Sequence, residues 1–203
     1  MSPISFSATT VTNPVGVQST YPLVTTPSHE GMLVSIEEAI IRSYVNQEST
    51  PIPFGAMVQI DNSPTTNEFN AVQLAVNATL IQGVVVDTLA MEGAVGAYTG
   101  VLTNVAADGR LGVASGRGVQ VLRRGVIWVY TTESVAMGDP VRYWDTDFSG
   151  TTAGAFVGRF CTSQSTTRTC LAGAGFAWAS ERSGAGLVQL DVNLPNSAGS
   201  ADA

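Results

Sequence analysis

Hydrophobic and polar residues alternate with a period of two in several stretches after residue 51, and this is the period of a β-strand. In 54–61 the apolar residues fall on one face: Phe54, Ala56, Val58 and Ile60. The stretch 187–194 alternates in the same way, with four apolar residues on the inward face: Val188, Leu190, Val192 and Leu194. The polar residues between them are Gln189, Asp191 and Asn193. The pattern predicts half-buried strands in both places.

Two other stretches are apolar on both faces. Residues 82–87 run Gln-Gly-Val-Val-Val-Asp, and residues 126–130 run Val-Ile-Trp-Val-Tyr. Continuous apolar runs of this length are typical of strands that are covered on both sides. Shorter strands are expected at 72–76, 111–114, 141–144, 155–161, 169–171 and 174–179, and 90–118 is otherwise expected to be a Gly-rich loop. We therefore predict an all-β fold, a compact Greek-key β-barrel or sandwich of short strands with at most one short helix.

One segment before the barrel has two competing interpretations. Ser35 and Glu38 match a capping box, which predicts a short helix over 35–45. The β-branched residues Ile40, Ile41 and Val45 lower helix propensity and favour a strand over 39–46. The sequence alone leaves both open.

The first 33 residues are predicted to form an extended N-terminal arm. They contain four prolines, which prevent a sustained helix and make poor central strands: Pro3, Pro14, Pro22 and Pro27. They also contain apolar residues that make the segment too hydrophobic for a solvated linker: Phe6, Val11, Val15, Val17, Tyr21, Leu23 and Val24. We expect the arm, 1–33, to lie on its own domain or on a neighbour. A β-rich domain is expected over 34–195, followed by a disordered polar tail over 196–203.

Charge narrows the range of partners. The chain has nine arginines, no lysine and a net charge of −7. Nucleic-acid phosphates and anionic membrane surfaces repel such a chain, so neither is expected as a partner. The sequence contains no apolar run of the roughly 20 residues that span a bilayer, and its N-terminus lacks a basic start and an apolar core like those of a secretory signal. We expect synthesis in a cytoplasm.

Motifs for catalysis or metal binding are incomplete. Residues 145–150 resemble the start of a calcium loop, but Phe156 stands where a bidentate Glu is needed. The Gly-rich stretch 109–116 lacks the Gly-Lys-Ser/Thr ending of a phosphate loop. His29 is the only histidine and lies in the Pro/Ser-rich arm, so no Ser-His-Asp triad is expected. We predict no catalytic, cofactor-binding or metal-binding residue, and therefore no enzyme.

Two residue pairs have open roles. Cys161 and Cys170 flank a turn-rich segment, so they would face each other across a hairpin, although reduced thiols are expected in a cytoplasm. Arg123 and Arg124 form the one basic pair. They are interpreted either as solvated strand ends with local ion pairs, or as contacts to carboxylates on a partner.

Several motifs in order resemble the structural cement protein family of tailed bacteriophages. The most distinctive are Arg-Gly-Val-Ile-Trp-Val (124–129), Thr-Thr-Glu-Ser-Val (131–135) and Gly-Asp-Pro-Val (138–141), followed by Tyr143. The similarity continues in Gly-Ala-Gly-Leu-Val-Gln-Leu (184–190) and, upstream, in Ile-Arg-Ser-Tyr-Val-Asn-Gln (41–47) and Gln-Gly-Val-Val-Val (82–86). It covers roughly residues 31 to 195.

This resemblance implies a non-enzymatic β-rich protein without a cofactor, on the outer surface of a DNA-filled head. Such a protein is made in the host bacterial cytoplasm and clamps neighbouring major capsid proteins, with self-association as a homotrimer or homodimer. The candidate capsid contacts are the 90–118 loop and eight individual residues: Phe6, Val11, Val15, Val17, Tyr21, Leu23, Arg123 and Arg124. The alternative is a head-fibre or tail-associated module that binds a receptor or glycan, with Tyr143 or Trp144 stacked on sugar rings.

Overall fold

A computed structural model describes residues 28–36, 38–61, 71–76, 80–87, 103–106, 109–146, 156–164, 169–173 and 175–195. This part of the chain contains β-strands and no helix, which confirms the predicted all-β class. The strands are β1 (Ile40–Asn46), β2 (Ile52–Pro53), β3 (Met57–Ile60), β4 (Ala71–Leu74), β5 (Ile81–Val85), β6 (Thr103–Val105), β7 (Leu111–Val113), β8 (Gly118–Thr131), β9 (Arg142–Trp144), β10 (Phe160–Cys161), β11 (Thr169–Leu171), β12 (Phe176–Trp178) and β13 (Gly186–Asn193).

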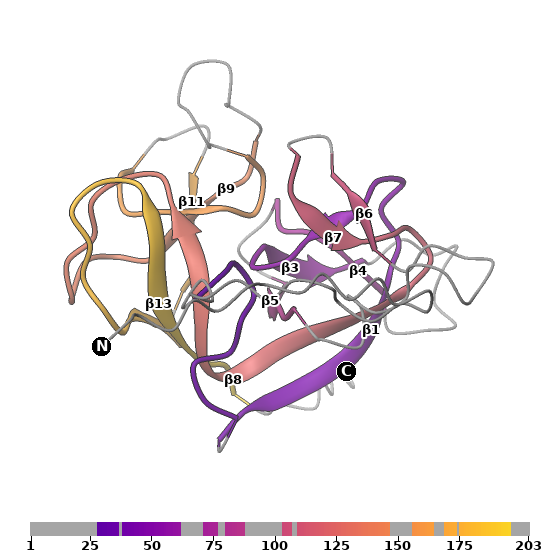
Figure 1. The fold of residues 1–203 in the computed structure, drawn as a ribbon, viewed down its shortest axis with the longest axis horizontal. Coiled ribbons are helices and arrows are strands. Elements are labelled where there is room, and N and C mark those ends of the chain that lie inside the picture. The colour runs from indigo at the N-terminus through magenta and orange to yellow at the C-terminus, as the bar shows by residue number, and fades with distance from the viewer. Residues whose placement is uncertain are drawn as a thin grey trace, which may run out of the picture.

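Five strands close into a barrel. They follow the order β1-β4-β3-β5-β8, and pairing between β1 and β8 completes the ring (Figure 1). All neighbours in the ring are antiparallel except β1 and β4. The separate sheet β2-β7-β6 contributes Ile52 and Val113 to the same hydrophobic cluster as the barrel residues Val58, Val85 and Val121.

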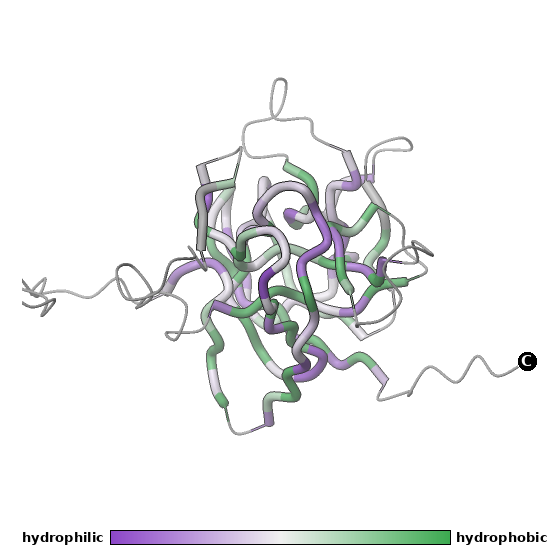
Figure 2. Tube along the Cα trace, turned by 90° about the vertical axis from the view of Figure 1, so that its right-hand side faces the viewer, coloured by the Kyte–Doolittle hydropathy of each residue, from purple (hydrophilic) through white to green (hydrophobic). Residues whose placement is uncertain are grey.

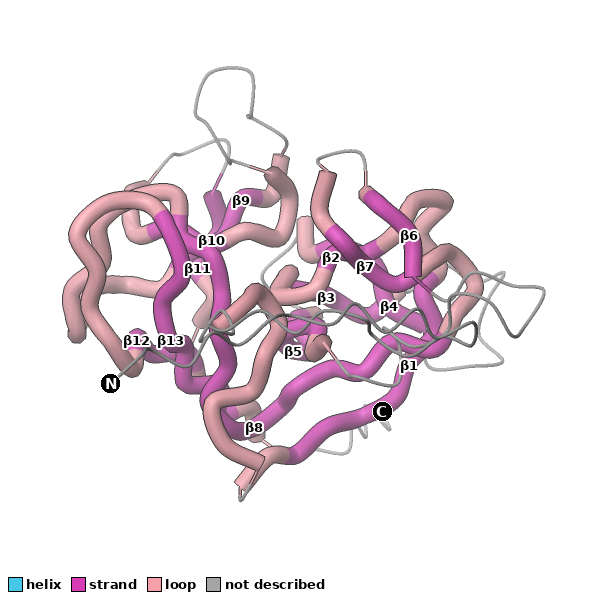
Figure 3. Tube along the Cα trace, in the orientation of Figure 1, coloured by secondary structure: helices cyan, strands magenta, loops and turns pink. Residues whose placement is uncertain are grey.

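The second half of β8 leaves the barrel and organises a further group of strands (Figure 3). Residues 124–131 of β8 pair with β13, and β12 pairs with the other edge of β13. At its end β8 also pairs with β10, which continues through β9 to β11. Tyr143, Phe160 and Trp178 fill the core between these strands, and the rings of Phe160 and Trp178 meet edge-on with centroids 6.3 Å apart.

Strands β3 and β5 have both faces buried because the two cores lie on opposite sides of them. Successive residues alternate between the cores: Met57 and Val84 belong to the larger cluster, and Val58 and Val85 belong to the barrel cluster. All four side chains have 0% exposure. The continuous apolar run at 82–87 has this physical cause, and its prediction as a strand covered on both sides is confirmed.

A bulge interrupts β8 where it passes from the barrel to the second group of strands. Ile41 lies opposite Leu122 and Ile40 lies opposite Arg124, so Arg123 is the extra residue on β8. Gly125 follows with φ +125, a conformation that side-chain-bearing residues rarely adopt. An inserted residue bends a strand and exchanges its two faces. The bulge therefore lets one strand serve two cores.

The predicted helix over 35–45 is wrong, and the strand interpretation is correct. Residues 40–46 form β1, which pairs with the first half of β8 and with β4. The capping-box match is overridden because the β-branched residues complete the barrel wall, and tertiary pairing outweighs a local propensity. The short strands β2 and β6 and the first half of β8 were also not predicted.

The cysteines do not face each other across a hairpin. Strand β9 lies between β10 and β11, and its residues Arg142 and Tyr143 pair with Cys161 and Cys170 respectively. Two strand spacings separate the cysteine backbones by roughly 10 Å, and a disulfide needs Cα atoms within about 7 Å. Cys161 is a free, buried thiol.

Candidate functional site

The end of the predicted arm is fixed to the second half of β8 by backbone hydrogen bonds. We call residues 28–34 the arm root. The Gly31 amide donates to the carbonyl of Trp128 and the Trp128 amide donates to the carbonyl of Met32, both at 2.8 Å. The Val34 amide donates to the carbonyl of Val126 at 2.9 Å. The arm root thus runs along the second half of β8.

Close packing also requires a glycine in the arm root. Gly31 has φ +85, and a Cβ atom there would lie 2.8 Å from Cβ of Phe54 and 2.9 Å from the amide nitrogen of Asp87. That amide donates a 2.8 Å hydrogen bond to the carbonyl of Gly31. Only a residue without a side chain lets the backbones approach this closely.

Charged side chains connect the arm root to the rest of the molecule. The Glu30 carboxylate lies 3.3 Å from Nη2 of Arg159 and 3.8 Å from Nη1 of Arg110, and the two arginine side chains are only 12% and 8% exposed. The guanidinium of Arg159 also stacks over the Tyr130 ring at 4.2 Å. Glu30 therefore ties the arm root to the turn before β7 and to the turn before β10, and Arg159 connects the latter turn to β8.

A hollow of about 340 Å³ lies beside this cluster, lined by His29, Glu30, Phe54, Asp87, Arg110 and Leu111. Nε2 of His29 is 2.9 Å from Oδ2 of Asp87, so the histidine pairs with a carboxylate. No Ser, Thr or Cys is among these described lining residues. The charges here hold segments together.

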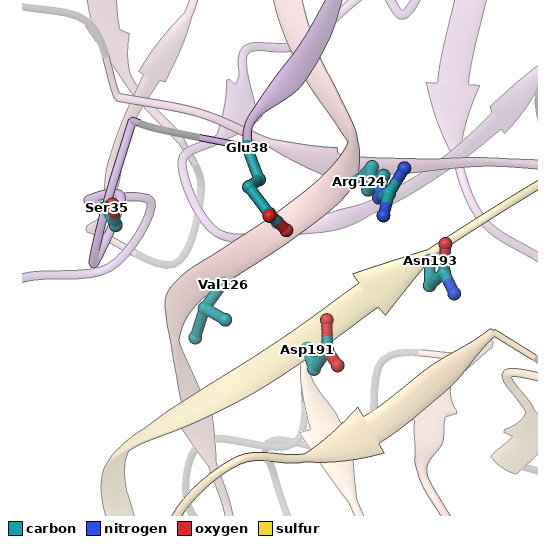
Figure 4. Close-up of a pocket in the computed structure, with 7 residues that line it drawn as sticks. Ser35, Glu38, Arg124, Val126, Asp191 and Asn193 are labelled. Atoms are coloured by element: carbon teal, nitrogen blue, oxygen red, sulfur yellow. The ribbon is translucent and has the colours of Figure 1, made fainter.

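A second hollow, of about 390 Å³, opens on the surface beside the bend of β8 (Figure 4). We call it the β8 hollow. Its lining residues come from the segment before β1, from β8 and from β13: Ser35, Glu38, Arg124, Gly125, Val126, Asp191 and Asn193. Among the described residues, none forms a salt bridge with Glu38, Arg124 or Asp191.

The structure separates the two arginines that the sequence paired. Arg123 is 7% exposed, and its guanidinium donates to Oε1 of Gln82 at 2.6 Å and to the carbonyl of Pro195 at 3.1 Å. Arg124 is exposed and lines the β8 hollow. The structure therefore leaves Arg124 accessible to a partner and commits Arg123 to contacts within the chain.

The other candidate contacts are only partly visible. The six apolar arm residues lie outside the described residues: Phe6, Val11, Val15, Val17, Tyr21 and Leu23. Of the 90–118 loop, only 103–106 and 109–118 are described, and Arg110 there contacts the arm root. No sequence pattern signals the arm root itself, because its ion pairs join residues far apart in the chain.

The two aromatic residues proposed to stack on sugars are buried. Tyr143 has 0% exposure and Trp144 has 8%, and both lie in β9. The Trp144 indole donates to the Thr132 hydroxyl at 3.3 Å. The strand predicted at 141–144 is present as β9, paired on both sides by β10 and β11, and neither side chain is open to stack on a sugar ring.

Glu133 holds the turn after β10. Its carboxylate accepts hydrogen bonds from the backbone amides and the hydroxyls of Thr162 and Ser163. Partial burial raises the pKa of Glu133, but the hydrogen bonds from Ser163 and Thr162 together outweigh this and lower it below 4.5. Beside it, burial and the negative charge of Glu133 raise the pKa of the Cys161 thiol to about 12. A thiol with so high a pKa is a poor nucleophile.

Two further features are missing from the described residues. They contain no group of three or more His, Cys, Asp or Glu side chains that could hold a metal ion. They also contain no helix that is long and apolar enough to cross a membrane.

The described chain is thus a two-core β-fold whose arm root is held by backbone hydrogen bonds and ion pairs. The family model described as structural cement protein (E217 gp24/Pam3 gp6) matches residues 17–193, so the chain belongs to the phage structural cement protein family. This confirms the resemblance drawn from the sequence. Membership assigns a structural role in the phage capsid, in association with capsid proteins. A search of curated proteins finds no match to the chain.

Proposed function

We propose that this protein binds the outer surface of the phage head, clamps neighbouring major capsid proteins and stabilises the DNA-filled shell without catalysing a reaction. The match of residues 17–193 to the cement family carries the proposal. A net charge of −7 supports the outward location, because an acidic protein is not attracted to the packaged DNA.

The arm is the proposed clamp. Residues 1–28 contain no charged side chain, and they carry the six apolar candidates named above. Such a segment is suited to lie across a neighbouring subunit or to add a strand to an open sheet edge. Burial of its apolar surface contributes roughly 25 cal/mol per Å², before the costs of association.

The arm root is the proposed route by which force on the arm reaches the barrel. A pull on the arm acts first on the backbone bonds from Gly31 and Val34 to β8, and then on the Glu30 pairs with Arg110 and Arg159. Removing one partner of a buried ion pair leaves an uncompensated charge, so these contacts resist separation. Self-association as a homotrimer or homodimer stays a prediction. A measurement of the protein's mass in solution tests it.

The test compares undecorated heads of the phage incubated with three proteins: the full chain, a deletion of residues 1–27, and a full-length arm variant. The deletion stops at 27 because residues 28–34 pack on the barrel. The arm variant keeps the length but carries Ser at the six apolar candidates. Copies bound per head and the temperature of DNA release are measured. We expect both altered proteins to fold normally, to bind fewer copies and to protect DNA less.

If both altered proteins bind and protect as well as the full chain, the arm is not the clamp. If the full chain itself binds heads without raising the temperature of DNA release, the cementing function is contradicted.

A further inference from the structure

The β8 hollow brings together three charges that the described chain does not pair. Glu38 comes from the segment before β1, Arg124 from β8 and Asp191 from β13, and all three line one opening (Figure 4). None of them takes part in a salt bridge or hydrogen bond with another described side chain. Arg124 and Asp191 are held by the pairing of β8 with β13, and Glu38 lies two residues before β1.

Apolar side chains flank this opening. Ile36 is 79% exposed and Val34 is 41% exposed, on either side of Ser35, which lines the hollow. We call the described residues 34–36 and 38–39 the corner. It projects at the lower end of the molecule, with hydrophobic segments running down to it (Figure 2). Exposed apolar side chains beside charges that no described residue pairs resemble the centre and rim of a protein interface.

The chain's own arm does not fit as the occupant. Residues 1–28 offer no charged side chain, so an arm placed in the hollow would leave Glu38, Arg124 and Asp191 without partners. The family associates with capsid proteins, and this makes a capsid protein the appropriate partner. The hollow holds two carboxylates and one guanidinium, so the complementary surface carries more positive than negative charge.

We propose that the β8 hollow and the corner seat a segment of the major capsid protein. That segment presents an arginine or lysine to Glu38 and Asp191, a carboxylate to Arg124, and an apolar pocket or side chain to Ile36. The proposal rests on the proposed clamping of capsid proteins, and it adds a second attachment point at the end of the barrel, independent of the arm.

The test is a binding titration on undecorated heads with charge-reversed proteins. Arg124→Glu and Glu38→Arg each turn an attraction into a repulsion, and we expect each to weaken binding by at least about tenfold. Ile36→Ser tests the apolar contact. The matched controls are Arg117→Glu, at an exposed arginine just before β8, and Glu181→Arg, at an exposed glutamate before β13. Both controls change charge equally and are expected to bind as the unaltered protein does.

Three further measurements make the outcome decisive. Thermal unfolding of each variant establishes that it is folded. Sedimentation establishes whether self-association has changed. Selection for capsid-protein mutations that restore binding of Arg124→Glu is expected to yield a change from an acidic to a basic residue.

Unchanged head binding by the hollow variants overturns the inference while leaving the clamp intact. Loss of self-association in place of loss of head binding also overturns it, and assigns the hollow to a second copy. Failure of the unaltered protein to bind heads contradicts the proposed function itself.

Discussion

At the scale of single residues, Glu133 makes the folded state sensitive to acid. Its pKa is lowered below 4.5 in the folded protein, so its contribution to stability is present above pH 4.5 and is lost as the pH falls through the lowered value. We expect Glu133→Gln to reduce the free energy of unfolding by about 1 kcal/mol near neutral pH, a modest value because the carboxylate is partly exposed.

Urea unfolding of the two proteins across pH measures this contribution. The difference between them is expected to shrink as the pH falls below 4.5, with Glu181→Gln as an exposed control that changes little at any pH. If the difference in unfolding free energy between the two proteins stays constant with pH, the substitution destabilises the protein through altered packing or hydrogen-bond geometry and not through the lost charge.

Arg123 and Arg124 show where single-residue prediction stops. The sequence presents them as equivalent neighbours, and on a regular strand they would simply occupy opposite faces. The bulge at Arg123 and the positive φ of Gly125 decide which one is buried, and both depend on how β1 and β13 pair with β8. The pairing is a long-range property, so the sequence identified the basic pair but not the different environments.

At the scale of elements, the arm root depends on the close approach of Gly31. We expect Gly31→Ala to destabilise the protein by roughly 1–3 kcal/mol and to loosen the arm root, because the new methyl group meets Phe54 and the Asp87 amide in a backbone conformation that alanine disfavours. Gly109→Ala is the matched control: its φ is +82, close to the +85 of Gly31, but nothing lies within 4 Å of the added Cβ.

Hydrogen exchange at the backbone amide of residue 31, which donates to the carbonyl of Trp128, reports the loosening of the arm root directly. Faster exchange in the residue-31 variant than in the residue-109 variant isolates the steric contact from the backbone strain. Equal exchange in the two shows that close packing does not hold the arm root.

Strands were predictable from sequence where a regular period survives. The alternation at 187–194 and the apolar run at 82–87 both correspond to strands, β13 and β5. The period-two alternation of apolar residues is interrupted in β8, because the bulge shifts the inward face by one residue. Only the second half of β8 was predicted. It also fails for β2, because two residues are too few to show a period. The helix prediction at 35–45 failed for another reason: a local capping pattern competed with the barrel closure made by β1.

At the scale of the whole molecule, the two cores are expected to unfold together. Strands β3 and β5 supply side chains to both, so neither core persists once these strands separate. Val84 and Val85 are adjacent, both with 0% exposure, and point into different cores. We expect Val84→Ala and Val85→Ala each to cost ~2 kcal/mol, through lost apolar burial and the cavity that remains.

Each variant is expected to shift one cooperative transition, seen at the same midpoint by tryptophan fluorescence and by far-ultraviolet circular dichroism. Tryptophan fluorescence reports on Trp128, Trp144 and Trp178, none of which belongs to the barrel cluster, whereas circular dichroism reports on all the strands. Val76→Ala, at a residue that is 52% exposed, is the control and is expected to change the midpoint little. Two separate transitions, one moved by Val84→Ala and the other by Val85→Ala, contradict the shared-strand argument. A single transition means that neither core stays folded once the other is lost, as the sharing of β3 and β5 between them predicts.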